Sequence, residues 1–189
     1  MGKLIASIFV SIDNIMVAEN EDMSWVLDNF DPEMGEDMGK EVMNSMQAIL
    51  IGHTTYDIMV KHWPNMIEAE APGADQMNHT PKFVFSKSLK KAEWGKYDKA
   101  TVVKEIIPEE IERMKKQSGE KMVIMGSASL VQQFTNLHLI DEYVLWLHPV
   151  VLGSGKPLFQ DIKVRNDLSL IKAKTYKTGV IALTLLPKK

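Results

Sequence analysis

The sequence Ile49-Leu50-Ile51-Gly52-His53-Thr54-Thr55-Tyr56 runs from an apolar stretch through a glycine and hydroxyl residues into a helical pattern. The same design returns at Val123-Ile124-Met125-Gly126-Ser127-Ala128-Ser129-Leu130. Each stretch predicts a buried strand that ends at a glycine and leads directly into an α-helix. A glycine there lets the backbone approach a ligand closely, and the free N–H groups that begin the helix can hold a phosphate.

Together, two such junctions predict a binding site for the pyrophosphate of a dinucleotide. Ligands of open α/β sheets gather outside the carboxyl ends of the strands, where both junctions are expected to lie. The alternative is that the glycine and hydroxyl residues only cap the two helices. Neither junction carries the Gly-x-Gly-x-x-Gly pattern of a Rossmann domain. Gly153-Ser154-Gly155-Lys156 lacks two defining residues of a P-loop, because Val150 and Pro157 stand in their places, and it predicts a turn.

Strand and helix patterns alternate outward from the two junctions. The apolar stretch from Leu4 to Ile12 predicts a central strand buried on both faces. Further strands are expected at 47–51, 82–86, 100–103, 121–125, 140–151, 168–174 and 180–186, and helices at 37–46, 54–61, 108–116 and 127–137. Residues 18–36 and 62–81 are expected to be irregular. The last two strands flank Tyr176-Lys177-Thr178-Gly179, which indicates a hairpin.

These elements predict an α/β fold with one mixed, mainly parallel sheet, helices on both faces and a closing antiparallel hairpin. No internal repeat or shift in composition divides the chain, so residues 1–189 are expected to form a single domain. The formal net charge of −3 provides no general basic field, which argues against a nucleic acid partner.

Residue usage excludes several other classes of protein. The chain contains no cysteine, which rules out disulfides, thiolate metal sites and a cysteine nucleophile. The five histidines show no metal-ligand spacing with one another or with carboxylates, so no metal site is expected. No apolar run approaches the roughly 20 residues of a membrane span, and the N-terminus lacks a secretory pattern. The expectation is a cytoplasmic protein with no membrane partner.

Two groups of side chains outside the junctions are candidates for chemistry. Glu36 and Asp37 belong to an acidic region, and in most proteins such a region is a solvated helix face. One of them could supply a proton if it points into a cleft, where burial would raise its pKa toward neutrality. Trp25 and Phe30 are expected to anchor the core or a lid, with stacking on a flat heterocycle as the alternative.

Five segments resemble known families, in the same order along the chain. Gly52-His53-Thr54-Thr55-Tyr56 resembles the Gly-Arg-x-Thr-Trp/Tyr signature of dihydrofolate reductases. Lys82–Ser86 is similar to their next strand, which ends in a cofactor-binding serine, and Met125–Val131 is similar to their glycine turn before a helix. Leu139–Tyr143 and His148–Phe159 resemble the reductase domain of the bifunctional riboflavin-biosynthesis deaminase–reductase. The resemblance covers nearly the whole chain.

This resemblance implies a dihydrofolate reductase-like, three-layer α/β/α fold, NADPH as cofactor and a homodimer. The implied reaction is reduction of a small pyrimidine or pteridine, such as dihydrofolate or 5-amino-6-(5-phosphoribosylamino)uracil. The implied cofactor-binding residues are Ser7, Ile15, Gly52, His53, Thr54, Thr55, Ser86, Lys87, Gly126, Ser127, Ala128 and Leu130. Trp25 and Phe30 would contact the substrate, and Glu36 or Asp37 would be the catalytic carboxylate.

Two departures from the family pattern leave questions open, and one is that the sequence Met34–Gly39 around Glu36 and Asp37 does not match the family, which leaves the acid unassigned. His53 replaces the arginine that can pair with the 2′-phosphate of NADPH, and a neutral imidazole is a poorer phosphate partner. Lys87 could compensate, and NADH is not excluded as the cofactor. The missing arginine and the unassigned acid also motivate a second hypothesis, a non-catalytic, dimeric nucleotide-binding module on the same fold.

Overall fold

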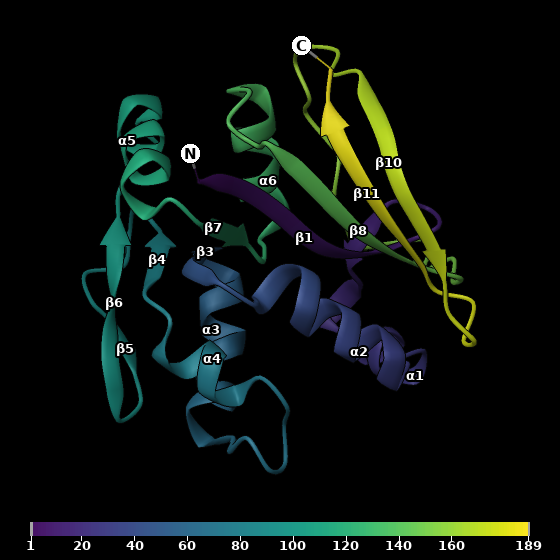
Figure 1. Ribbon diagram of the computed structural model, residues 1–189, viewed down its shortest axis with the longest axis horizontal. Helices are drawn as coiled ribbons and strands as arrows, with labels where there is room; N and C mark the ends of the chain where they lie inside the picture. Colours follow the sequence, from purple (N-terminus) through teal and green to yellow (C-terminus); the bar gives the residue numbers. More distant parts are fainter. Residues whose placement is uncertain (1, 189) are drawn as a thin grey trace.

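The computed structural model describes residues 2–188 and shows a single large sheet between two layers of helices (Figure 1). The strands of this sheet are β1 (Lys3–Ser11), β3 (Met46–Gly52), β4 (Lys82–Phe85), β5 (Ala92–Trp94), β6 (Tyr97–Val103), β7 (Lys121–Ile124), β8 (Glu142–His148), β10 (Leu168–Thr175) and β11 (Ile181–Pro187). Their spatial order is β10-β11-β8-β1-β7-β3-β4-β6-β5. A separate pair is formed by β2 (Ile15–Val17) and β9 (Lys156–Pro157).

The centre of the sheet is parallel and its two edges are antiparallel. Strands β8, β1, β7, β3, β4 and β6 are paired in parallel. Strand β11 runs antiparallel to β8 and forms the predicted hairpin with β10, while β5 turns back on β6. The predicted mixed, mainly parallel sheet with a closing antiparallel hairpin is therefore confirmed.

The helices are α1 (Ser24–Asp28), α2 (Pro32–Met38), α3 (His53–His62), α4 (Ala74–His79), α5 (Pro108–Ser118) and α6 (Ala128–Asn136). One apolar core joins α5 and α6 to one face of the sheet, and a second core joins α2, α3 and α4 to the other. Strand β1 serves both cores, because Leu4, Ala6 and Ile8 face the first and Ile5 faces the second. This double burial explains why β1 is apolar almost throughout.

The helix expected at 37–46 begins earlier in the structure. Asp31 caps α2 by accepting a hydrogen bond from the backbone N–H of Glu33 at 2.8 Å, and Pro32 occupies the first turn. Both residue types favour that position, so the start signal was present in the sequence. After Met38 the chain widens into a π-helical turn, and Met46 already begins β3.

The expectation of irregular structure was wrong for parts of two segments. Residues 18–36 contain α1 and the start of α2, and residues 62–81 contain α4 and a short 3-10 turn at Trp63–Asn65. Strand β5 was not predicted. These elements are short, and the prolines and glycines around them are typical of loops, so local pattern alone did not reveal them. Within residues 2–188, no helix is both long and apolar enough to cross a membrane.

Candidate functional site

The two glycine junctions meet where the central strands of the sheet have their carboxyl ends. Strands β3 and β7 are parallel neighbours, so both junctions leave the sheet at the same end of the strands. The Gly52 N–H donates a hydrogen bond to the Gly126 carbonyl at 3.0 Å. A Cβ on Gly52 would overlap Ser127 Oγ, and one on Gly126 would lie 2.6 Å from the Cε of Met16. Glycine is therefore the residue that fits at both positions.

Helices α3 and α6 begin at this meeting point with open N-termini. Gly52, the cap residue of α3, has no side chain, and Ser127, the cap residue of α6, makes no side-chain capping hydrogen bond. The Ser127 hydroxyl instead lies 2.9 Å from the hydroxyl of Ser129. Of the alternative that glycine and hydroxyl residues only cap the helices, the structure shows Gly52 and Ser127 at the two cap positions but no hydroxyl capping hydrogen bond. The N-terminus of a helix carries unpaired N–H groups and partial positive charge, so two of them side by side suit an anion.

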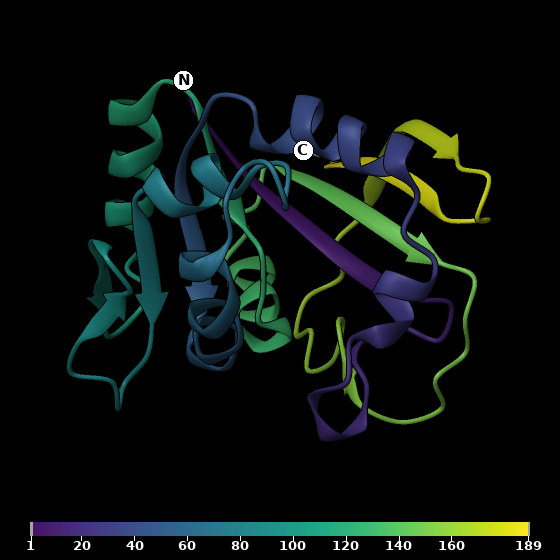
Figure 2. The same ribbon diagram turned by 90° about the horizontal axis from the view of Figure 1, so that it is seen from below.

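The segment after β1 lies against the loop after β8 and borders the glycine pair. Figure 2 shows this purple segment beside the green loop, where β2 pairs with β9. Asp13 joins the two by accepting hydrogen bonds from the Ser11 hydroxyl at 2.6 Å and the Gly153 N–H at 2.7 Å. These hydrogen bonds lower the pKa of Asp13 to about 2, and the bond from the Ser11 hydroxyl contributes most. The Ser11 hydroxyl also accepts a hydrogen bond from the Ile15 N–H at 2.9 Å, and the next residue, Met16, lies against Gly126.

His53 occupies the other side of the glycine pair. Its Nδ1 lies 3.2 Å from the Ser86 hydroxyl and 3.4 Å from that of Ser88, and its Nε2 lies 3.5 Å from the Asp57 carboxylate. Lys87 is exposed, and its backbone carbonyl accepts a hydrogen bond from the Lys104 ammonium at 3.2 Å. The structure thus brings together His53 and Ser86, two of the residues proposed for the cofactor. Ser88 and Asp57 also contact His53 but were not among the residues expected here, although Asp57 stands one helical turn after His53.

A series of hydrogen bonds and one ring contact connects β1 to α2. The Trp146 indole N–H donates to the Ser7 hydroxyl at 3.0 Å, and Trp146 packs against Tyr176 with ring centroids 6.3 Å apart. The Tyr176 hydroxyl donates to the Asp37 carboxylate at 2.8 Å, and Lys174 also bonds this carboxylate. The Lys174 hydrogen bond is the main reason why the pKa of Asp37 is lowered.

Glu36 and Asp37 differ in their surroundings despite being neighbours. The Glu36 side chain is 69% exposed and pairs with Lys40 at 3.2 Å, whereas the Asp37 side chain is 16% exposed and faces β10. Because its pKa is lowered, Asp37 is an ionised acceptor at neutral pH. The arrangement suits Asp37 to orienting a group rather than to donating a proton.

The two aromatic candidates are also placed differently. Trp25 is 5% exposed and meets the buried ring of His148 edge-on, with centroids 5.1 Å apart. Phe30 is 43% exposed and lies over Gly35 of α2. Among the expected cofactor residues, Leu130 is buried in the core beneath α6, so its side chain packs against the sheet.

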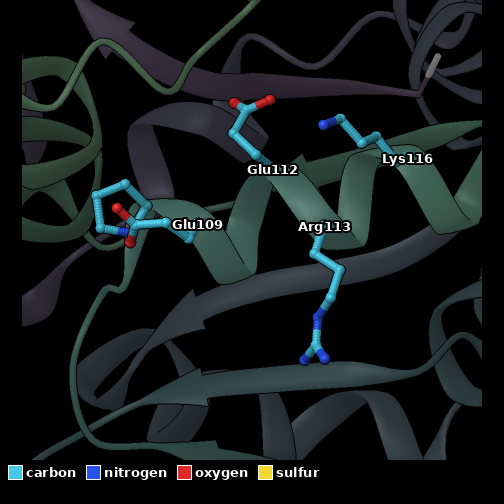
Figure 3. Close-up of a pocket in the computed structure, with 5 residues that line it drawn as sticks. Glu109, Glu112, Arg113 and Lys116 are labelled. Carbon is cyan, nitrogen blue, oxygen red and sulfur yellow. The ribbon is translucent and has the colours of Figure 1, made fainter.

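Two shallow hollows elsewhere on the surface do not belong to this site. One is lined by residues of α4, and the other, of about 410 Å³, lies along α5 (Figure 3). In Figure 3 Glu112 and Arg113 point to opposite sides of α5, so these side chains do not converge on a ligand. Throughout residues 2–188, no three histidines or carboxylates are grouped so that they could hold a metal ion.

Comparisons with known proteins agree with this architecture. The family model described as the RibD C-terminal domain matches residues 2–182. The Bacillus subtilis (strain 168) protein YyaP is 31% identical over 186 residues, which cover 96% of this chain and 93% of YyaP. YwjB from the same organism is 27% identical over 178 residues, 94% of each chain.

Solved structures share the fold. A putative riboflavin biosynthesis protein from Shewanella sp. PV-4 superposes with a TM-score of 0.81 at 21% identity, covering 99% of both chains. A diaminohydroxyphosphoribosylaminopyrimidine deaminase/5-amino-6-(5-phosphoribosylamino)uracil reductase from Thermotoga maritima gives a TM-score of 0.65 at 13% identity, covering 99% of this chain and 57% of that protein. The extent of the family match and the identity to YyaP together show that this chain belongs to the RibD C-terminal domain family.

Proposed function

We propose that this protein is an NADPH-dependent reductase of a small pyrimidine or pteridine, with NADH not excluded as the cofactor. The observation that carries the proposal is the contact between Gly52 and Gly126, which places two uncapped helix N-termini side by side. The family supports a reductase of this type, since its solved relatives include the Thermotoga maritima uracil reductase.

Residues around the glycine pair would hold the cofactor along the sheet edge. The pyrophosphate would lie on the amides of Gly52, Thr54 and Thr55 from α3 and of Gly126, Ser127 and Ala128 from α6. His53, Ser86 and Lys87 would face the adenosine end, and Ser7 and Ile15 the nicotinamide end. The cofactor supplies the hydride, while the chain orients it against an electron-poor C=N or C=O group.

Asp37 would orient the substrate, and ordered water would deliver the proton. This carboxylate is the less exposed of the two candidates and is bonded to Tyr176, which packs on Trp146. With a lowered pKa it accepts hydrogen bonds from substrate N–H groups at neutral pH. Glu36 pairs with Lys40 at the surface and has no such neighbour.

The proposal is tested by titrating purified protein with NADPH and with NADH. Binding should quench tryptophan fluorescence and raise the melting temperature, with about 2.7 kcal/mol of stabilisation when the ligand is at a hundred times its Kd. NADPH oxidation is then followed by absorbance with dihydrofolate, pterin and aminopyrimidine substrates. If neither nucleotide binds at millimolar concentration, the proposal is wrong.

A second candidate function is a non-catalytic nucleotide-binding module. Its motivation is His53, which stands where the dihydrofolate reductase signature has an arginine and whose Nε2 lies 3.5 Å from the carboxylate of Asp57. This hypothesis predicts nucleotide binding without turnover. Measurable NADPH oxidation with any of the substrates named above would reject it.

The exposed edge of the sheet supports the expected homodimer. Strand β10 has one neighbour in the sheet, and Leu170 and Ile171 on it are 58% and 59% exposed. They stand at a register shift between β10 and β11, which brings two consecutive apolar side chains to the surface. An apolar edge strand favours association with another chain, and we propose a second copy of this protein as the partner.

A further inference from the structure

Lys104 anchors the turn that follows β4, although Lys104 itself follows β6. Its ammonium donates hydrogen bonds to the backbone carbonyls of Lys87, at 3.2 Å, and of Leu89. Since these two carbonyls flank Ser88, the ammonium is fixed beside that residue. An ammonium has three N–H donors, and the third has no acceptor among the described residues. The turn therefore carries a cation that is held in place and can still donate to a ligand.

The same turn presents two hydroxyl groups to His53. The Ser86 hydroxyl accepts a hydrogen bond from the Leu89 N–H at 3.0 Å and lies 3.2 Å from Nδ1 of His53. The Ser88 hydroxyl lies 3.4 Å from the Ser86 hydroxyl and 3.4 Å from the same Nδ1, and both distances are long for a hydrogen bond. Ser88 is exposed, so its hydroxyl can turn toward a ligand without the loss of a strong bond.

This turn continues the line of the glycine pair along the carboxyl ends of the strands. Strands β7, β3, β4 and β6 are consecutive parallel neighbours (Figure 1). Strand β3 ends at Gly52, β4 is followed by Ser86, and β6 is followed by Lys104. Neighbouring strands lie about 4.8 Å apart, so the end of β6 is about 10 Å from that of β3. A dinucleotide with its pyrophosphate on the glycine pair and its adenosine beside Ser86 therefore brings its ribose to this turn.

The charge of this part of the chain suits an anion. Residues 86–105 include six lysines and three carboxylates, although the whole chain has a net charge of −3. The exposed Lys87 side chain has no hydrogen-bond or ion-pair partner among the described residues, whereas the Lys104 ammonium is anchored. A phosphate monoester carries a charge of about −1.5 to −2 at neutral pH. NADPH differs from NADH by such a group on the 2′ oxygen of its adenosine ribose.

We propose that Lys104 supplies the fixed positive charge for the 2′-phosphate of NADPH and so determines the preference for NADPH over NADH. This inference rests on the proposed reductase function and names which nucleotide its site prefers. Lys104 takes the place of the arginine that is absent at His53, but it reaches the phosphate from β6 instead of α3. Its charge attracts the phosphate, and its bonds to the two carbonyls hold Ser88 where the serine hydroxyl can donate to a phosphate oxygen.

Nucleotides that differ only in the 2′-phosphate test the proposal. The probes are NADPH against NADH, and 2′,5′-ADP against 5′-AMP, which represent the adenosine end alone. Titration calorimetry at low salt should show at least tenfold tighter binding of the 2′-phosphorylated member of each pair to the unmodified protein. High salt should reduce this ratio, because charges near the protein surface are screened.

Variants of Lys104 separate recognition of the phosphate from support of the turn. Lys104→Met removes the charge, and we expect it to weaken NADPH and 2′,5′-ADP at least tenfold while the Kd values for NADH and 5′-AMP stay within twofold. Lys104→Arg retains the charge and should recover part of the loss. Lys99→Met is the matched control, because Lys99 on β6 is 65% exposed and pairs with Glu93 at 2.8 Å. It should alter none of the four affinities.

The outcomes distinguish this inference from a structural role and from the proposed function. If Lys104 only supports the turn, Lys104→Met weakens NADPH and NADH by the same factor, and that result would overturn the inference. Equal affinities of the unmodified protein for NADPH and NADH, or an NADPH affinity that Lys104→Met leaves unchanged, would overturn it as well. Failure of the unmodified protein to bind either dinucleotide would instead overturn the reductase itself.

Ser88→Ala provides a check that does not depend on how Lys104→Met folds. Ser88 is exposed and its hydroxyl makes only long contacts, so alanine should leave the melting temperature unchanged. We expect the variant to lower the ratio of NADPH to NADH affinity through weaker NADPH binding. An unchanged ratio would overturn the assignment of the 2′-phosphate to this turn.

Discussion

At the residue scale, Gly126 is the position where a single methyl group should do most harm. Its φ is +119°, which side chains rarely adopt, and a Cβ would lie 2.6 Å from Met16 Cε and 2.9 Å from Thr55 Oγ1. We expect Gly126→Ala to cost about 2 kcal/mol of stability and to abolish NADPH binding, because the junctions must separate. Thermal unfolding and fluorescence titration measure the two effects.

The matched control is Gly39→Ala. Gly39 has a helical φ of −55°, and a Cβ there meets nothing within 4 Å. Alanine should therefore stabilise the protein by about 0.5–1 kcal/mol and leave NADPH binding unchanged. Equal NADPH affinity in Gly126→Ala and the unmodified protein would contradict the role assigned to the glycine pair.

His148 predicts a loss of stability in mild acid. The folded protein holds this imidazole neutral down to a pKa of about 4, whereas the unfolded chain binds the proton near 6.5. The unfolded state therefore binds more protons between these values, and stability present above pH 6.5 falls as the pH drops toward 4, by up to about 3 kcal/mol. Urea unfolding at pH 7 and 4.5 measures the loss, which should be smaller in His148→Leu. Equal losses in both proteins would contradict the prediction.

At the scale of elements, Asp37 connects α2 to Lys174 of the edge strand β10 and to Tyr176, the residue that follows this strand. Asp37→Asn retains the shape and removes the charge, so we expect about 1–2 kcal/mol lower stability at neutral pH by urea unfolding. The lowered pKa of Asp37 means that this contribution is present above pH 3.8 and is lost in more acid solution.

Glu36→Gln on the same helix is the control for Asp37→Asn. Glu36 is exposed and pairs with the exposed Lys40, so the change should stay within about 0.5 kcal/mol. The two variants also separate the candidate carboxylates in the reaction, since substrate orientation by Asp37 predicts that kcat/KM falls in Asp37→Asn alone. A larger loss of activity in Glu36→Gln would reverse the assignment.

At the scale of the whole molecule, the exposed apolar pair on β10 predicts a dimer. Light scattering after size exclusion should give twice the mass of the chain, and Ile171→Glu should give the monomer because a charge cannot be buried unpaired at the interface. Ile67→Glu is the control, since Ile67 is 51% exposed in a loop outside the sheet. A monomeric unmodified protein at high micromolar concentration would contradict the prediction.

Much of the architecture could be predicted because its signals are local. A buried strand such as β1 is recorded in a run of apolar residues, and a glycine followed by hydroxyl residues marks a strand–helix junction. The hairpin of β10 and β11 is likewise marked by Tyr176-Lys177-Thr178-Gly179. Helix α4 was missed, because six residues among prolines and glycines give too short a pattern.

The partners of the site residues could not be predicted, because they are brought together by strand order. Asp37 meets Lys174 across a separation of 137 residues, and its pKa depends on that meeting. The contact of Trp25 with His148 likewise exists because α1 folds over the end of β8. No local pattern records whether a buried histidine finds a hydrogen-bond partner.

The sequence by itself determined the longer strands, the two glycine junctions and the α/β class, because periodicity and backbone freedom are properties of neighbouring residues. Only the tertiary structure decided that Gly52 and Gly126 touch, that Asp37 is held ionised, and that His148 is buried without a hydrogen-bond partner among the described residues. These facts depend on which strands become neighbours, and burial and charge pairing follow from that packing.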